Sequence, residues 1–193
     1  MGDWQNLDLV SSEFSPDWEE AISIFEKRIR FRFLKPVEYL LSVEEGIGLK
    51  ERRNGFSIMA ILCLLIESLQ CFLEGKGHSK GISKEVFVRF LTENEPFRTK
   101  LGISQVIAEK IFIHVRCGIL HQAEITGGTR LRSVGPTVRL QGEKLIINRT
   151  KFANGIFQFF EDYLKILRLK TEKGKSFREN LKRKVETIIK NCA

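Results

Sequence analysis

Apolar residues recur at steps of three and four positions over most of the chain, and this spacing predicts an architecture built mainly from helices. The pattern is clearest over five segments, at about 16–41, 54–75, 104–122, 151–170 and 176 onward. A shorter stretch at about 83–91 predicts one further helix. The sequence contains no internal repeat and no low-complexity segment.

Polar residues and prolines mark where several of these helices are expected to begin. The pair Ser15–Pro16 supplies a capping hydroxyl and a proline suited to the first helical position. Pro36 should kink or restart the first helix, because proline cannot donate the backbone hydrogen bond. Thr150 is the predicted cap of the fourth long helix, and Ser176 with Glu179 has the spacing of a capping box.

The second long helix is apolar on all sides over residues 58–66. A helix of this kind is typical of the centre of a core, so we expect it to be the central helix of the bundle. Glu67 follows the apolar run directly. An acid in such a place is usually paired or partly solvated.

Between residues 129 and 148 the apolar period changes from helical spacing to two, and Gly142 is a predicted turn. This pattern indicates a small β-hairpin or a three-stranded insert. The predicted fold class is therefore all-α (mainly), a helical bundle with a small β insert at about 129–148. We expect a single domain over 1–193, ending in a basic helical segment at 165–193.

The composition fits a globular chain with a sizeable core. The chain has 193 residues, of which 42% are hydrophobic, so its stability needs neither disulfides nor a metal. Its first residues lack the basic-then-apolar order of a secretory signal. The longest uninterrupted apolar run has nine residues, whereas a membrane span needs about 20. We therefore expect a soluble, cytoplasmic protein with no membrane partner.

The net charge of +8 is concentrated at one end of the chain. Residues 165–193 hold ten Lys or Arg and three Glu, which leaves only about one positive charge of surplus for the rest. Localised positive charge attracts phosphate backbones or an acidic partner. Lys182, Arg183 and Lys184 are the candidate nucleic-acid-binding residues, although the same charges would also suit a solvated helix face.

The sequence lacks the motifs of several common classes of enzyme and metal site. The four cysteines form no Cys-x-x-Cys pair, and the three histidines form no His-x-x-x-His pair. Nucleophile-elbow, P-loop and dinucleotide-binding motifs are also missing. We therefore expect reduced thiols, no metal site and no cofactor.

Arg116 and His121 are the remaining candidates for chemistry, at the end of the third long helix. Metal-free RNA cleavage needs a base for the 2′-OH and a cation for the more negative phosphorane. Histidine suits the first role because its ordinary pKa is near 6.5, and arginine suits the second because its planar fork matches phosphate oxygens. Gly118, between them, leaves room for a backbone or a ligand to approach.

This Arg-x-x-x-x-His arrangement, at the end of an apolar helix in a helical domain, resembles the HEPN superfamily. The segments 66–70 and 122–128 also look like those of uncharacterised bacterial proteins of similar size. The family often has a polar residue directly after the arginine, where this chain has Cys117. The resemblance implies a four- or five-helix bundle that dimerises, so that two copies of the motif line one cleft.

The resemblance further implies a metal-independent endoribonuclease that cleaves RNA through attack of the 2′-OH. Arg116 and His121 would be the catalytic residues, and Glu67 would orient His121 or fix Arg116. Gln122 and Glu124 are further candidates for support. The implied partners are RNA, a second copy of the chain, and an antitoxin or regulatory protein, in a toxin–antitoxin or phage-defence setting.

Two other functions fit the same residues. The fold could bind nucleic acid or an acidic protein without chemistry, or it could be a structural or regulatory homodimer. In the binding module Lys182, Arg183 and Lys184 would bind the partner and Arg116 would anchor a phosphate. In a purely structural role Arg116 would pair with Glu67 or Glu124, and His121 would be a hydrogen-bonded residue at the helix end.

Overall fold

The computed structural model describes residues 2–48 and 53–192, so the first and last residues of the single domain expected over 1–193 lie outside the described residues. The chain is mainly helical, with a small sheet late in the sequence. In chain order the elements are the 3₁₀ turn η1 (Gly2–Asn6), α1 (Pro16–Ile29), the π-helical segment η2 (Arg30–Leu34), α2 (Lys35–Ser42), α3 (Gly55–Glu74), α4 (Ser83–Glu93), α5 (Gln105–Lys110), the π-helical segment η3 (Ile111–Cys117), α6 (Gly118–Gln122), β1 (Arg130–Arg132), β2 (Val138–Gln141), β3 (Lys144–Asn148), α7 (Arg149–Leu167) and α8 (Glu172–Cys192). The expected fold class, all-α (mainly) with a small β insert, is confirmed.

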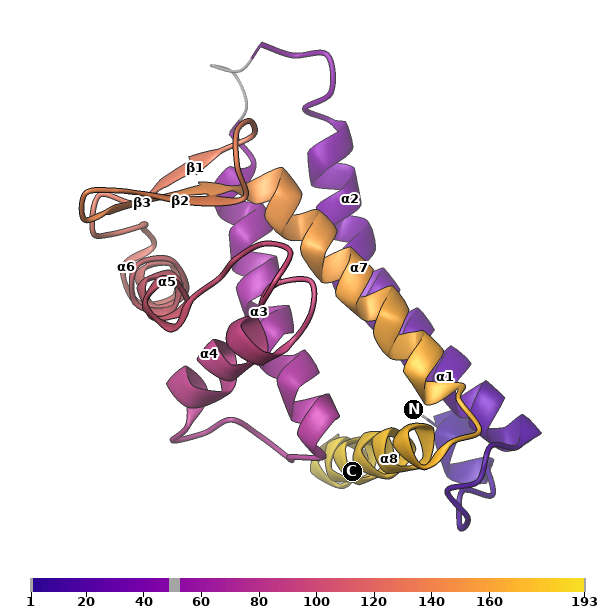
Figure 1. The fold of residues 1–193 in the computed structure, drawn as a ribbon. Helices are drawn as coiled ribbons and strands as arrows, with labels where there is room; N and C mark the ends of the chain where they lie inside the picture. The colour runs from indigo at the N-terminus through magenta and orange to yellow at the C-terminus, as the bar shows by residue number, and fades with distance from the viewer. Residues whose placement is uncertain (1, 49–52, 193) are drawn as a thin grey trace.

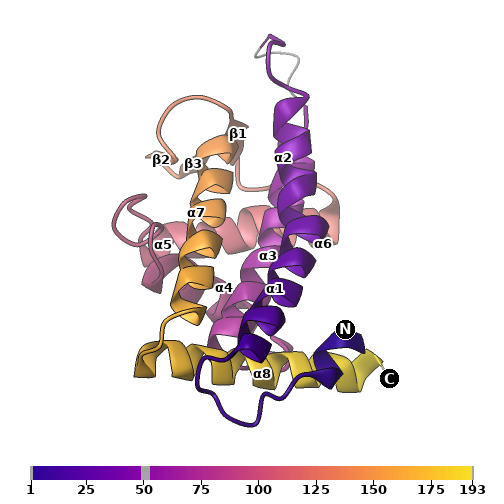
Figure 2. The same ribbon diagram turned by 90° about the vertical axis from the view of Figure 1, so that its right-hand side faces the viewer.

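The helices pack around α3, as the apolar pattern predicts. α3 contacts α2, α4, α7, α8 and η3. In both views α7 runs beside the long rod formed by α1, η2 and α2, and α8 crosses the lower end of the bundle (Figures 1 and 2). The third long helix, formed by α5, η3 and α6, is seen nearly end-on in Figure 1 and from the side in Figure 2.

α3 is the central core helix, with most of its side chains buried. By length and composition α3 could cross a membrane, although 61% of its most apolar stretch is buried within this fold, as in the core helix of a globular protein. Leu64 departs from the expected all-round burial, since 57% of it is exposed. This exposed leucine lies one helical turn before Glu67.

The β insert is a three-stranded sheet with the order β1-β3-β2. β3 runs parallel to β1 and antiparallel to β2, with Leu140 opposite Leu145 in the β2–β3 hairpin. Gly142 forms the turn with a φ of +58°, a conformation that glycine adopts without steric cost. Leu145 and Ile147 are buried against the helical core, so the sheet covers the end of the bundle where α7 begins (Figure 1).

Two predicted helix starts are wrong. α7 is capped by Asn148, whose side chain accepts a hydrogen bond from the Lys151 amide, and not by Thr150. α8 begins at Glu172, so Ser176 and Glu179 lie inside the helix. The reason is local, because the Lys175 amide already bonds the Thr171 carbonyl and closes a turn earlier in the chain.

The third long helix is continuous but changes its winding in η3. Ser104 caps its start, and Ala123 ends it in the left-handed conformation with a φ of 51°. The helix therefore ends at Gln122, as the apolar pattern over about 104–122 predicts. A π-helical segment widens the turn and often occurs at functional sites, and η3 carries Arg116.

Candidate functional site

Arg116 is held firmly at the end of η3. Its Nε donates to Oε1 of Glu67 at 2.6 Å, and its guanidinium carbon lies 5.3 Å from the ring centre of Phe112. Only 17% of the Arg116 side chain and 10% of the Glu67 side chain are exposed. Burial alone would lower the pKa of Arg116, but the hydrogen bond and charge of Glu67 raise it above the ordinary value, so the guanidinium stays charged.

Glu67 serves Arg116 and not His121. Its second oxygen, Oε2, accepts a hydrogen bond from the hydroxyl of Ser79 at 3.0 Å. Both carboxylate oxygens are therefore occupied within the chain. The sequence left two acids open as partners of Arg116, and the structure pairs it with Glu67. The carboxylate of Glu124 instead accepts a hydrogen bond from the backbone amide of Ile125.

Arg116 opens onto a pocket of about 270 Å³ between α3, the loop after it, η3 and α8. The pocket is lined by Leu64, Glu67, Ser68, Cys71, Gly77, His78, Ser79, Arg116 and Lys184. Lys184 enters from α8, donates from Nζ to the Gly77 carbonyl at 2.5 Å, and lies 5.8 Å from the ring centre of Phe72. Burial lowers the pKa of Lys184. The site thus combines two cations with one fully occupied carboxylate.

His121 lies outside this pocket. It is exposed on α6, and among the described residues its side chain has no hydrogen-bond or ion-pair partner. Within one chain, Arg116 therefore does not bend toward His121 as its length would allow. The hydrogen-bonded helix terminator considered from the sequence is also absent, because the helix ends through the left-handed Ala123.

The other two candidates for support do not reach Arg116. Gln122 is exposed, and Glu124 is exposed with its carboxylate on the Ile125 amide. The fold requires glycine at position 118, because a Cβ there would lie 2.5 Å from the Glu124 carbonyl oxygen. The room that Gly118 provides is used by the chain's own backbone.

The three basic candidates on α8 lie in different surroundings. Lys182 donates to the Leu9 carbonyl at 2.8 Å, Arg183 is exposed and bonds Asn180, and Lys184 lines the Arg116 pocket. Arg178, another of the basic residues in the segment 165–193, is completely buried. α8 therefore uses part of its positive charge inside the fold.

The sequence did not predict a site role for His78 or Ser79, or that Lys184 and Arg116 share a pocket. His78 is exposed in the loop that follows α3, and its place in the pocket comes from the packing of that loop under α8. The only local signal is the position of this loop directly after the helix that carries Glu67. Contacts between residues so far apart in sequence have no local pattern.

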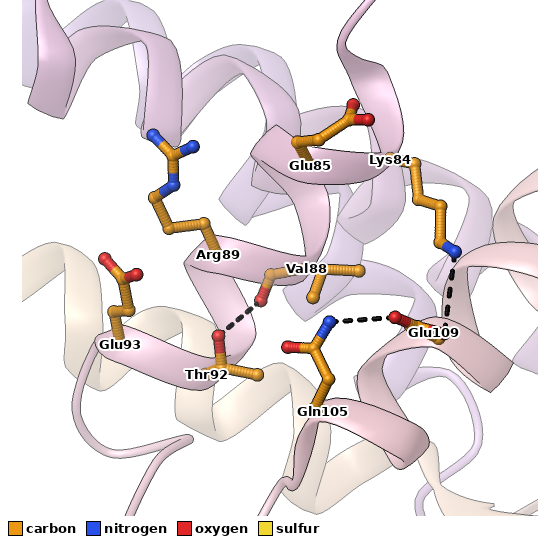
Figure 3. Close-up of a pocket in the computed structure, with 8 residues that line it drawn as sticks. All are labelled: Lys84, Glu85, Val88, Arg89, Thr92, Glu93, Gln105 and Glu109. Carbon is orange, nitrogen blue, oxygen red and sulfur yellow. Dashed lines mark hydrogen bonds and ion pairs between the residues drawn. The ribbon is translucent and has the colours of Figure 1, made fainter.

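A second pocket, of about 360 Å³, lies between α4 and α5 (Figure 3). Its polar groups are largely bonded to each other, as Glu109 accepts from Gln105 at 2.8 Å and pairs with Lys84 at 3.5 Å. Arg89 turns to Glu74, 2.6 Å away, and Glu85 and Glu93 point away from one another (Figure 3). No set of polar groups converges on one point there, so this pocket is a weaker candidate.

Within residues 2–48 and 53–192, no group of three or more His, Cys, Asp or Glu side chains is arranged to hold a metal ion. Comparison with known proteins finds no matching family model, no matching curated protein and no matching solved structure.

Proposed function

We propose that this protein is a metal-independent endoribonuclease of HEPN-like type that acts as a homodimer. The observation that carries the proposal is the firmly held guanidinium of Arg116 beside an open pocket, with the exposed imidazole of His121 at the end of the same helix. A fixed cation for phosphate and an accessible base are the two groups that the reaction needs.

In the proposed reaction, the imidazole of His121 accepts the proton of the ribose 2′-OH. The 2′-oxygen then attacks the adjacent phosphorus, and the bond from phosphorus to the 5′-oxygen breaks. The leaving oxygen takes up a proton, so the products are a 2′,3′-cyclic phosphate and a 5′-OH. Arg116 stabilises the additional negative charge of the phosphorane.

The separation of Arg116 and His121 supports the homodimer in this proposal. His121 does not line the pocket of Arg116, so one chain alone does not offer both groups to one phosphate. Four large aliphatic side chains are exposed on α3 and the third long helix, namely Leu64 at 57%, Val106 at 57%, Ile113 at 47% and Leu120 at 54%. Exposed apolar side chains gain free energy when a partner surface buries them. A second copy would bring its own His121 to the Arg116 pocket.

An antitoxin or regulatory protein, in a toxin–antitoxin or phage-defence setting, is part of this proposal by resemblance alone. The proposal also includes a cytoplasmic location.

Mixing two inactive variants tests the composite site. Arg116→Ala and His121→Ala proteins are unfolded together, refolded at equal amounts and assayed on RNA in EDTA. If each site takes Arg116 from one subunit and His121 from the other, one intact site forms per mixed dimer, and about a quarter of the wild-type rate returns. No recovery above the separate variants contradicts the shared site.

The second candidate is RNA binding without cleavage. The pairing of Arg116 with Glu67 favours it, because the acid neutralises part of the charge that a phosphorane would need. RNA affinity that falls steeply with salt, without any cleavage product, would support this function over the nuclease.

A further inference from the structure

The pocket beside Arg116 has unused hydrogen-bond donors from two cations. A guanidinium has five N–H donors and an ammonium has three. Arg116 uses Nε on Glu67 and directs Nη1 to the Cys117 sulfur at 4.0 Å, while Lys184 uses one N–H on the Gly77 carbonyl. Among the described residues no acceptor is bonded to Nη2 of Arg116 or to the other two N–H groups of Lys184.

The charge of the pocket favours an anion. Glu67 is the only carboxylate among its lining residues, and both of its oxygens accept hydrogen bonds within the chain. Arg116 and Lys184 together outweigh it by one positive charge. Burial lowers the pKa of Lys184, and a bound anion would offset this cost by favouring the charged amine.

The size of the pocket selects a small group. Its volume of about 270 Å³ is just below the roughly 300–1,000 Å³ of pockets that enclose a whole small molecule. The hydroxyls of Ser68 and Ser79 already donate inside the fold, to the Leu64 carbonyl and to Glu67. The donors that remain for a ligand are therefore the cations and the exposed ring of His78 at the mouth.

We propose that this pocket is a phosphate-binding subsite in which Lys184 of α8 and Arg116 of η3 bind the same phosphate group. Charge-assisted N–H donors from two directions are the usual recognition of phosphate in proteins. The assignment of that phosphate to RNA rests on the proposed nuclease function, but binding itself needs neither His121 nor cleavage.

The test uses His121→Ala protein, so that no substrate is cut. Inorganic phosphate, and one RNA oligonucleotide prepared with a 5′-phosphate and with a 5′-OH, are titrated by calorimetry. Lys184→Met keeps the apolar stem and removes the charge, and Lys173→Met is the matched control because Lys173 is exposed on the same helix. We expect Lys184→Met to weaken binding about tenfold or more and Lys173→Met to weaken it less than about twofold.

The two oligonucleotides distinguish the sources of the phosphate. A Lys184-dependent preference for the 5′-phosphorylated form assigns the pocket to a terminal phosphate, and equal Lys184-dependent losses assign it to a phosphodiester. If Lys184→Met does not fold, Lys184→Arg replaces it and should retain binding within about threefold. Equal losses for Lys184→Met and Lys173→Met, or no loss for either, overturn the inference.

The outcome is separable from that of the nuclease proposal. If the wild-type protein cuts no RNA but phosphate binds through Lys184, only the nuclease fails. If it cuts RNA and Lys184→Met cuts and binds equally well, only the subsite fails.

Discussion

Nε of Arg116 lies 2.6 Å from Oε1 of Glu67 and joins the third long helix to the central helix α3. The two residues are 49 positions apart in the chain. Their side chains are mostly buried, and Ser79 occupies the remaining carboxylate oxygen. This pair fixes the direction of the guanidinium and forms one wall of the pocket that the proposed function uses.

Replacing Glu67 by alanine should destabilise the protein by about 3 kcal/mol, because the buried guanidinium of Arg116 would lose its partner. Glu124→Ala is the matched control. Glu124 is exposed and bonds only its neighbouring amide, so its removal should change the free energy of unfolding by less than about 0.5 kcal/mol. Urea unfolding followed by circular dichroism measures both. Equal changes for the two variants would contradict a structural role for the pair.

Arg178 should contribute more to stability than any other basic residue tested on α8. It is fully buried and donates to the carbonyls of Ser12, Leu167 and Leu169 at 2.8, 2.7 and 2.7 Å. Arg178→Met leaves these carbonyls without their donor, which should cost about 3 kcal/mol or more.

The control for Arg178 is Arg183→Met on the same helix. Arg183 is exposed, so its loss should lower stability by less than about 0.5 kcal/mol. Thermal unfolding compares the two proteins. A melting temperature for Arg178→Met within a degree or two of wild type would show that the buried contacts are dispensable.

Cysteine labelling should report on the surroundings of Arg116. Cys117 is half-buried with its sulfur 4.0 Å from Nη1 of Arg116, whereas Cys63 and Cys71 are buried and burial raises the pKa of both thiols. Because buried thiols are protected, iodoacetamide should modify Cys117 before Cys63 and Cys71 in the native protein. Mass spectrometry of the three peptides measures the rates. Labelling of Cys63 as fast as Cys117 would mean that α3 is not protected as the structure indicates.

The helices and the β insert follow from the periodicity of the sequence, because helical and strand spacing of apolar residues are local patterns. The starts of two helices were less predictable. Thr150 and Ser176 are good capping residues, but Asn148 and the Thr171 carbonyl provide the first hydrogen bonds two and five positions earlier. Where two caps compete over a few residues, the one that closes the first turn starts the helix, and the apolar pattern does not show which one that is.

The chemistry of the site was only partly predictable. Arg116, Glu67 and Lys184 were all named from the sequence, but their shared pocket depends on how α3, η3 and α8 pack. The opposite case is Arg178, which contributes to the positive charge of the segment 165–193 but is buried in the fold. Net charge shows where basic residues are in the chain and does not show which of them face solvent.

RNA cleavage in EDTA by wild-type, His121→Ala and His78→Ala proteins tests the central claim most directly, since His78 is the other exposed histidine and lines the Arg116 pocket. Removing an essential base should lower the cleavage rate by about 100-fold or more. The account predicts this loss for His121→Ala, cyclic-phosphate products from the wild-type protein, and a clearly smaller loss for His78→Ala, which removes one donor at the pocket but not the base. Undiminished cleavage by His121→Ala, or no cleavage of any RNA by the wild-type protein, would contradict it.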